Sequence, residues 1–327
     1  MYFDQLRRRE FITLLGGTAA AWPIPAPAQQ TRVRRIGWLV TGEPVSYRFS
    51  LAAFRDGLRS LNYIEGRNIE IIYKWAEGDL TRLPKLASDL VQERVDIILA
   101  GGTFGARAAK NASAAIPIVA AGAGDLVEAG LVNALAAPGG NLTGFSANIP
   151  EAGAKRLQMM KELVMPARRA GILFSQSLEL ETVKGSVSAL EVALRFYETR
   201  TMKDLDAALI SIHNDRPDMV VVLNDPFMFT HRKRIIEAMS AERLPAIYGF
   251  REYVDDGGLI SYGPSISDTY RRAAGYVDRI LKGERPADLP VQAPTKYDLV
   301  INLKTAKALG IELPSTMRAR AQELIEA

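Results

Sequence analysis

Cysteine is absent from the 327-residue chain, and histidine occurs only twice. The missing thiols exclude disulfides, thiolate metal sites, thiol nucleophiles and iron–sulfur clusters. The two histidines, His213 and His231, belong to no HExxH pattern and are not at metal-ligand spacing from each other. Because the residues needed for thiol and histidine catalysis are missing or few, we expect a protein that is not an enzyme and holds no metal or cofactor.

Catalytic and nucleotide-binding motifs are also missing. The chain contains no P-loop sequence and no GxSxG elbow. Residues 122–127 begin like a dinucleotide-binding loop, but Val127 stands where the third glycine belongs. Asp255 and Asp256 precede two glycines, a pattern more typical of a turn than of an acid/base pair.

The overall composition is that of a folded soluble protein, with 48% hydrophobic and 24% charged residues. At about 100–200 residues per domain, the length predicts two domains. The net charge of +4 is a small surplus over a long chain, so it gives no reason to expect a nucleic-acid partner. Disordered, collagen-like and coiled-coil classes are excluded.

The N-terminus has the three-part pattern of a secretory signal. Arginines at positions 7–9 precede an apolar stretch at 11–22, and Ala26-Pro27-Ala28 supplies the small-residue end. The apolar stretch is shorter than the roughly 20 residues that span a bilayer. Arg8 to Ile12 also matches the twin-arginine export pattern. We therefore expect residues 1–28 to be a signal peptide, cleaved near Ala28.

The missing cysteine also bears on the state of the protein after export, because no lipid-bearing cysteine can come after the signal. No later segment has the length and apolarity of a membrane helix. The prediction is a protein free in a bacterial periplasm, a monomer, with no membrane insertion after cleavage.

Short apolar runs alternate with amphipathic stretches from residue 34 onward. Strands are expected at 36–40, 69–75, 97–99 and 118–119. Apolar residues at helical spacing, Leu51, Phe54, Leu58 and Leu61 in one segment and Leu83, Leu86 and Leu90 in the next, indicate two helix faces. The short runs are apolar on both faces, as in parallel strands covered by helices. Repeated strand–helix alternation predicts an α/β fold with parallel sheets and right-handed crossovers.

A second set of such units begins after Pro150. Strands are expected at 172–174, 219–223, 246–248 and 259–262. A helix face is expected to run from Val183 to Leu194, and a later helix ends before Gly283 and Pro286. The tail from Val291 adds a strand and two helices. Residues 138–150 are rich in Gly, Asn and Pro and suit a connection between two lobes.

Polar and aromatic residues follow the predicted strands at their carboxyl ends, where open α/β sheets bind ligands. The candidate ligand-binding residues are Thr41, Gly42, Glu43, Ser46, Tyr47, Gly102, Thr103, Phe104, Gly122, Asn148, Ser175, Gln176, Asn224, Asp225, Tyr248 and Tyr262. Each also has a structural alternative: Thr103 as a helix cap, Gly122 as a tight turn, and Tyr47 or Phe104 as half-buried packing. The prediction therefore depends on the set as a whole.

Four segments resemble the ABC transporter substrate-binding proteins of the tryptophan/tyrosine type. They are residues 63–78, 131–144 with Pro138-Gly139-Gly140-Asn141, 257–263, and 281–302. The similarity extends over essentially the whole chain after the signal. It implies a type I periplasmic binding protein fold, in which two Rossmann-like lobes with parallel sheets are joined by a hinge of three crossovers. It also implies a small-molecule ligand and, as partner, an ABC permease with its ATPase. The ligands of the family include aromatic amino acids.

Two departures keep the ligand open. The chain has Ala147 where tryptophan-type members tend to carry an acidic residue, and Asn224-Asp225-Pro226 where they carry Thr-Asp-Asn. We expect residues 29–147 plus 263–291 to form the N-terminal lobe, and 148–262 plus 292–327 the C-terminal lobe.

The expected ligand is an amino acid or related carboxylate. Backbone N–H groups at Gly102 and Thr103, with the Ser175 hydroxyl, would hold its carboxylate. Glu43 or Asp225 would meet its ammonium group, and Tyr47, Phe104 or Tyr248 would stack on its side chain. Two alternatives remain: an exported ligand sensor for a membrane receptor kinase, and an enzyme on the same scaffold.

Overall fold

The computed structural model describes residues 33–147, 150–175, 177, 179–186, 190–224 and 226–326. The expected signal peptide, 1–28, lies outside these residues, so its role and cleavage stay predictions. Three candidate ligand-binding residues, Asn148, Gln176 and Asp225, also lie outside them.

The first sheet consists of five strands in the order β2-β1-β3-β4-β5, and every pair in it is parallel. Its strands are β1 (Arg34–Val40), β2 (Ile69–Trp75), β3 (Ile97–Gly101), β4 (Ile118–Ala123) and β5 (Leu142–Ser146). β3 is buried along its whole length, which is why its sequence is apolar without alternation. The parallel first sheet was correctly predicted from the short apolar runs.

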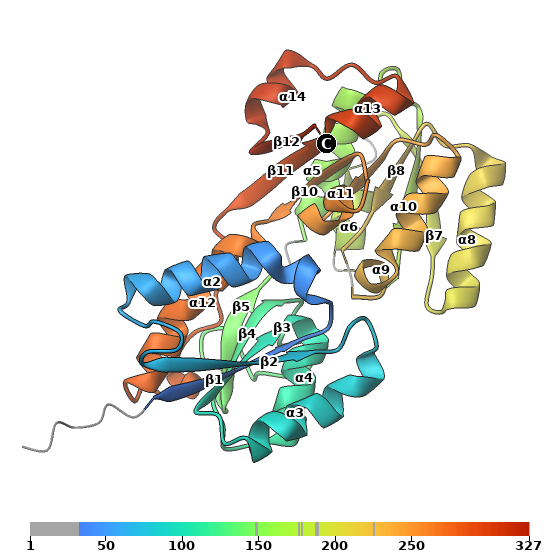
Figure 1. The fold of residues 1–327 in the computed structure, drawn as a ribbon. Helices are drawn as coiled ribbons and strands as arrows, with labels where there is room; N and C mark the ends of the chain where they lie inside the picture. Colours follow the sequence, from blue (N-terminus) through green and yellow to red (C-terminus); the bar gives the residue numbers. More distant parts are fainter. Residues whose placement is uncertain are drawn as a thin grey trace, which may run out of the picture. The chain divides into compact units, whose positions relative to one another are not determined.

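Helices from two distant parts of the chain cover the first sheet (Figure 1). They are η1 (Pro44–Tyr47), α2 (Arg48–Ser60), η2 (Leu80–Arg82), α3 (Leu83–Gln92), α4 (Gly102–Ala112) and, from much later in the chain, α12 (Ile266–Leu281). α12 shares a buried core with α2 and the first sheet. The two helices approach so closely at Gly57 that an added Cβ would lie 2.6 Å from the Arg271 carbonyl oxygen.

The second sheet has seven strands in the order β12-β11-β10-β9-β8-β6-β7. They are β6 (Arg169–Phe174), β7 (Ala193–Glu198), β8 (Met219–Val222), β9 (Ala246–Tyr248), β10 (Ile260–Pro264), β11 (Tyr297–Asn302) and β12 (Glu323–Ile325). Its helical elements are α5 (Ala152–Leu163), α6 (Glu179–Gly185), α8 (Met202–Asp215), α9 (Pro226–Thr230), α10 (Arg232–Ala241), α11 (Arg251–Asp255), α13 (Leu303–Leu309) and α14 (Ser315–Arg320).

One strand pair departs from the expected parallel arrangement. β10 and β11 are antiparallel, with Pro264 opposite Tyr297 and Ile260 opposite Ile301. The chain leaves β10 at Pro264 to form α12 on the first sheet, and it returns through η3 (Pro286–Asp288). Since it re-enters at the end where it left, β11 must run back along β10.

Two strands occupy segments for which we predicted something else. The helix face expected to reach Leu194 is wrong there, because α6 ends at Gly185 and Leu194 lies in β7, paired with Ala170 of β6. β5 lies inside the segment expected to be only a connection, and its Gly144 is essential to the pairing. An added Cβ on Gly144 would lie 2.0 Å from the Ala120 carbonyl oxygen. The tail also contains β12, which we did not predict.

The chain passes between the two sheets at three places: between β5 and α5, between β10 and α12, and before β11. The third passage is tied to β5, because Ser146 N–H donates to the Gln292 carbonyl (2.9 Å) and Gln292 N–H to that of Gly144 (2.9 Å). It is tied to the second passage through Ser265 N–H, which donates to the Lys296 carbonyl (2.9 Å). The expected division of the chain into two lobes, with its boundaries, stays a prediction.

Candidate functional site

The carboxyl ends of strands from both sheets border one cleft of about 520 Å³, a volume typical of small-molecule sites. From the first sheet, Thr41 follows β1, Gly102 follows β3 and Gly122 lies at the end of β4. From the second, Ser175 follows β6 and Asn224 follows β8. The cleft therefore lies where parallel α/β sheets bind ligands.

The structure brings most of the predicted candidates together. Those that line the cleft are Thr41, Ser46, Tyr47, Gly102, Thr103, Phe104, Gly122, Ser175 and Asn224. Four described candidates do not line it: Gly42, Glu43, Tyr248 and Tyr262. That the lining residues contact a ligand stays a prediction.

Three of these four candidates have surroundings other than the cleft. Tyr248 is only 1% exposed and stacks on Tyr253, with ring centroids 4.6 Å apart, so its ring belongs to the core of the second sheet. Tyr262 stacks on Tyr297 at 5.8 Å. Glu43 is an exposed residue before η1. The expected stacking role of Tyr248 and the expected ammonium contact of Glu43 therefore do not fit this cleft.

Helix α4 begins at the cleft with no side chain capping its N-terminus. The first-turn N–H groups of a helix have no intrahelical partner and carry a partial positive charge. Gly102 has φ +68°, a conformation that favours glycine. Thr103 does not cap the helix: its Oγ1 accepts a hydrogen bond from Gly124 N–H (2.9 Å), which ties α4 to the loop after β4. This corner of the cleft can hold an anion such as a carboxylate.

Aromatic rings form much of the cleft wall. Tyr47 meets Tyr270 edge-on, with centroids 6.3 Å apart, and Phe229 meets Phe250 in the same way at 5.5 Å. Trp38 backs Tyr270 in a parallel stack at 5.0 Å. Burial raises the pKa of both Tyr47 and Tyr270, so their hydroxyls stay neutral at physiological pH. The wall offers flat, uncharged surface to the apolar part of a ligand.

The lining residues that sequence reasoning missed include Phe229, Phe250, Glu252 and Tyr270. The first three follow β8 and β9, so extending the strand-end rule by a few residues would have found them. Tyr270 lies within helix α12. No local pattern distinguishes it from an ordinary core tyrosine, because its place in the cleft depends on α12 packing against the first sheet.

Two other acidic lining residues differ in their surroundings. Asp125 Oδ1 accepts hydrogen bonds from Val127 N–H (2.8 Å) and Glu128 N–H (2.9 Å), so it shapes its own loop. Glu128 is exposed at the cleft rim.

Glu252 has its Oε2 buried without a hydrogen-bond partner among the described residues. Burial raises the pKa of its carboxyl above the ordinary value of 4.5.

A buried ion pair holds the β8 end of the cleft. Arg156 and Glu179 are 0% and 1% exposed, and Arg156 Nη2 donates to Glu179 Oε2. Arg156 Nη1 also donates to the Tyr262 carbonyl (3.0 Å), while Glu179 Oε2 accepts from Asn224 N–H (3.0 Å). The Asn224 side chain occupies the space in which Gly249 would carry a Cβ, so a larger residue at position 249 would displace it. These contacts position Asn224 at the cleft.

Within the described ranges, no group of His, Asp or Glu side chains is arranged to hold a metal ion. Nor does any helix in that part of the chain have the length and apolarity to cross a membrane.

The two sheets, their helical layers and the shared cleft define the type I periplasmic binding protein fold. The chain belongs to the ABC transporter substrate-binding proteins, since the family matches residues 45–325. This is a family of solute-binding proteins rather than of enzymes.

Several known proteins are similar to this chain. The tyrosine-binding protein of Clostridioides difficile strain R20291 is 26% identical over 264 residues, which cover 79% of this chain and 76% of that protein. A solved conserved domain protein from Vibrio cholerae has 27% identity and a TM-score of 0.78, covering 90% of this chain and 100% of its own. An ABC domain from Streptococcus pneumoniae, solved with L-Trp, has 23% identity and a TM-score of 0.78 over the same shares, which shows a common fold.

Proposed function

We propose that this substrate-binding protein captures an aromatic amino acid, or a related amphipathic carboxylate, outside the cytoplasm for an ABC importer. The observation that carries the proposal is the composition of the cleft. The uncapped N-terminus of α4 stands in the same cavity as the rings of Tyr47, Tyr270 and Phe229. An anion site and an aromatic wall together match a carboxylate that has a flat apolar side chain.

In this proposal, the carboxylate lies against Gly102 and Thr103 N–H and the Ser175 hydroxyl, and the side chain lies against Tyr47 and Phe104. Because both sheets contribute residues, a ligand that touches both favours a closed arrangement of the lobes over an open one. The similarity to a tyrosine-binding protein supports this ligand class.

Export and partners complete the proposal. Residues 1–28 carry the twin-arginine-like signal, cleavage near Ala28 releases the protein into the periplasm as a monomer, and a permease with its ATPase receives the ligand. The family as a whole typically acts outside the cytoplasm. Genes for a permease and an ATPase beside this one would support import, whereas a sensor-kinase gene in their place would favour a sensing role.

The ligand is tested by thermal denaturation of the full chain against amino acids, aromatic acids and sugars, followed by calorimetry on each compound that raises Tm. We expect aromatic amino acids or acids to raise it. Tyr47→Leu should weaken binding. The matched variant Tyr297→Leu, whose ring stacks on Tyr262 away from the cleft, should not. A panel in which only sugars bind, or none of the compounds does, would contradict the proposed ligand class.

A further inference from the structure

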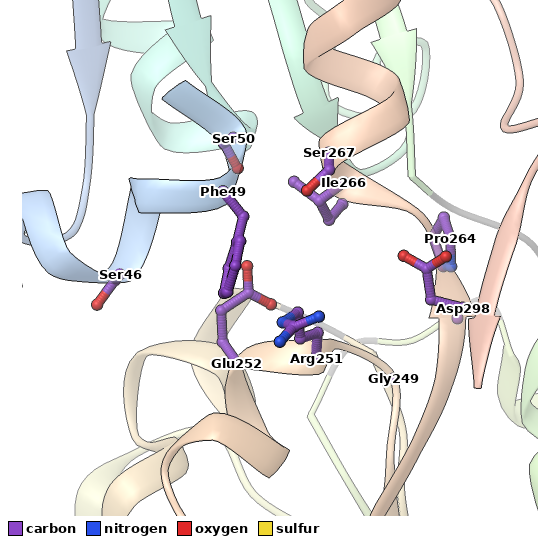
Figure 2. A pocket seen from close by; sticks show the side chains of 11 residues that line it. Ser46, Phe49, Ser50, Gly249, Arg251, Glu252, Pro264, Ile266, Ser267 and Asp298 are labelled. Carbon is purple, nitrogen blue, oxygen red and sulfur yellow. The ribbon is translucent and has the colours of Figure 1, made fainter. Parts of the chain in front are cut away.

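Glu252 is a charged residue of the cleft that the proposed ligand contacts leave unused. It lines the cleft and also a smaller adjoining pocket, which shares Ser46 and Ile266 with the cleft (Figure 2). Its Oε2 is buried and has no hydrogen-bond partner in the described part of the chain. A buried carboxylate oxygen without a hydrogen bond is costly, so a donor that reaches Glu252 Oε2 on binding gains more than a surface contact would.

Arg232 and Arg251 act electrostatically on Glu252 and oppose the rise of its pKa, but both form their ion pairs with other carboxylates. Arg232 pairs with Asp256 at 2.8 Å, and its Nη1 also donates to the Phe229 carbonyl at 3.3 Å. Arg251 pairs with Glu323 and, at 3.3 Å, with Asp255. Figure 2 shows Arg251 beside Glu252, with Phe49 opposite; the Arg251 guanidinium lies 4.1 Å from the centre of that ring.

The remaining neighbours of Glu252 favour an organic cation. Asp255, although paired with Arg251, acts on the Glu252 carboxyl and raises its pKa. Tyr47 and Tyr270 both interact electrostatically with Glu252, and both line the cleft as neutral rings. Aromatic faces attract ammonium groups, and a carboxylate beside them supplies a directional acceptor.

We propose that Glu252 is the specificity-determining counter-ion for a primary ammonium group of the bound ligand. The inference rests on the proposed function in that it uses the same cleft, and it supplies the ammonium contact for which Glu43 is misplaced. The ligand class it implies is an amine with an apolar body. In the amino acids, the carboxylate at the α4 N-terminus completes the recognition.

The test compares three probes on the full chain by calorimetry: L-tyrosine, tyramine, which lacks the carboxylate, and 3-(4-hydroxyphenyl)propanoate, which lacks the ammonium. Glu252→Gln keeps the shape of the side chain and removes its charge. The matched control, Glu237→Gln, removes the same charge from an exposed position on α10 outside the cleft. A calorimetric comparison of this kind separates loss of the ammonium contact from general damage to the cleft.

We expect Glu252→Gln to weaken L-tyrosine and tyramine about 10- to 100-fold and to leave the propanoate within about twofold. Glu237→Gln should change none of the three. Equal affinities in wild type and Glu252→Gln, or equal weakening of all three probes, would overturn the inference.

The same data distinguish the inference from the proposed function. If tyramine binds through Glu252 but neither the amino acid nor the propanoate binds, the inference stands and the proposed ligand class fails. If L-tyrosine binds and Glu252→Gln leaves it unchanged, the proposed function stands and the inference fails. Wild-type protein that binds neither amine probe contradicts the role of Glu252.

Discussion

The buried Arg156–Glu179 pair yields the largest stability effect that we predict for one substitution. Arg156→Met removes the hydrogen bonds to Glu179 and to the Tyr262 carbonyl, and it leaves a carboxylate that is 1% exposed without a counter-charge. Breaking one partner of such a pair costs about 3–5 kcal/mol. Burial already raises the pKa of Glu179 and Arg156 opposes that shift, so the variant favours a protonated carboxyl at this position.

A double variant shows whether charge or packing causes the loss. Arg156→Met with Glu179→Leu removes both buried charges, and such replacements are often neutral or stabilising. Here, however, Asn224 N–H loses its acceptor, at a cost of about 1–3 kcal/mol. The double variant should therefore be more stable than Arg156→Met and less stable than the wild type.

Urea unfolding followed by circular dichroism measures these differences in the free energy of unfolding. The control is Lys184→Met, which breaks an exposed pair on α6 (47% and 80% exposed, 2.7 Å from Nζ to Glu181) and should cost less than about 1 kcal/mol. Tryptophan fluorescence adds a regional readout, because Trp38 and Trp75 both lie in the first sheet. The reasoning is refuted if Arg156→Met costs no more than Lys184→Met, or if the double variant is the least stable.

Three further outcomes are expected from particular contacts. Gly57→Ala should lower Tm and reduce the free energy of unfolding by about 1–3 kcal/mol, because the new Cβ would meet the α12 backbone. The control, Gly275→Ala, meets nothing within 4 Å and should not lower Tm. Equal Tm values for the two variants would contradict this prediction. Because the pKa of Glu252 is raised, the folded state takes up a proton before the unfolded state does. The stability of wild type relative to Glu252→Gln should thus increase as pH falls from neutrality toward 4.5. Urea unfolding at several pH values measures this, and a difference in the free energy of unfolding that does not change with pH would contradict a buried carboxyl. Thr103→Val removes the hydrogen bond to the loop after β4 and should cost about 1 kcal/mol of stability. Calorimetry should also show ligand binding weakened several-fold. Unchanged affinity would mean that this hydrogen bond does not position the α4 N-terminus.

Local sequence patterns were sufficient for most of the fold. The strand predicted at 69–75 matches β2, and the runs at 97–99 and 118–119 lie inside β3 and β4. The predictions for β3 and β4 succeed because a strand covered on both faces is apolar along its length. β2 is an edge strand, and its exposed Glu70 lies between the buried Ile69 and Ile71. The same logic failed at Leu194, where apolar spacing fitted a helix but the residue lies in the outermost strand of the second sheet.

Some features of the site could likewise be predicted from the sequence, and others could not. The sequence alone determined the α/β class, the absence of thiol chemistry and the strand ends that line the cleft, because composition and short-range order carry that information. Only the tertiary structure decided that Tyr270 meets Tyr47 in the cleft wall, that Tyr248 faces the core, and that Glu252 Oε2 is buried without a hydrogen bond among the described residues. The physical reason is that these features depend on how distant segments pack, and burial and pairing are properties of that packing rather than of the residues themselves.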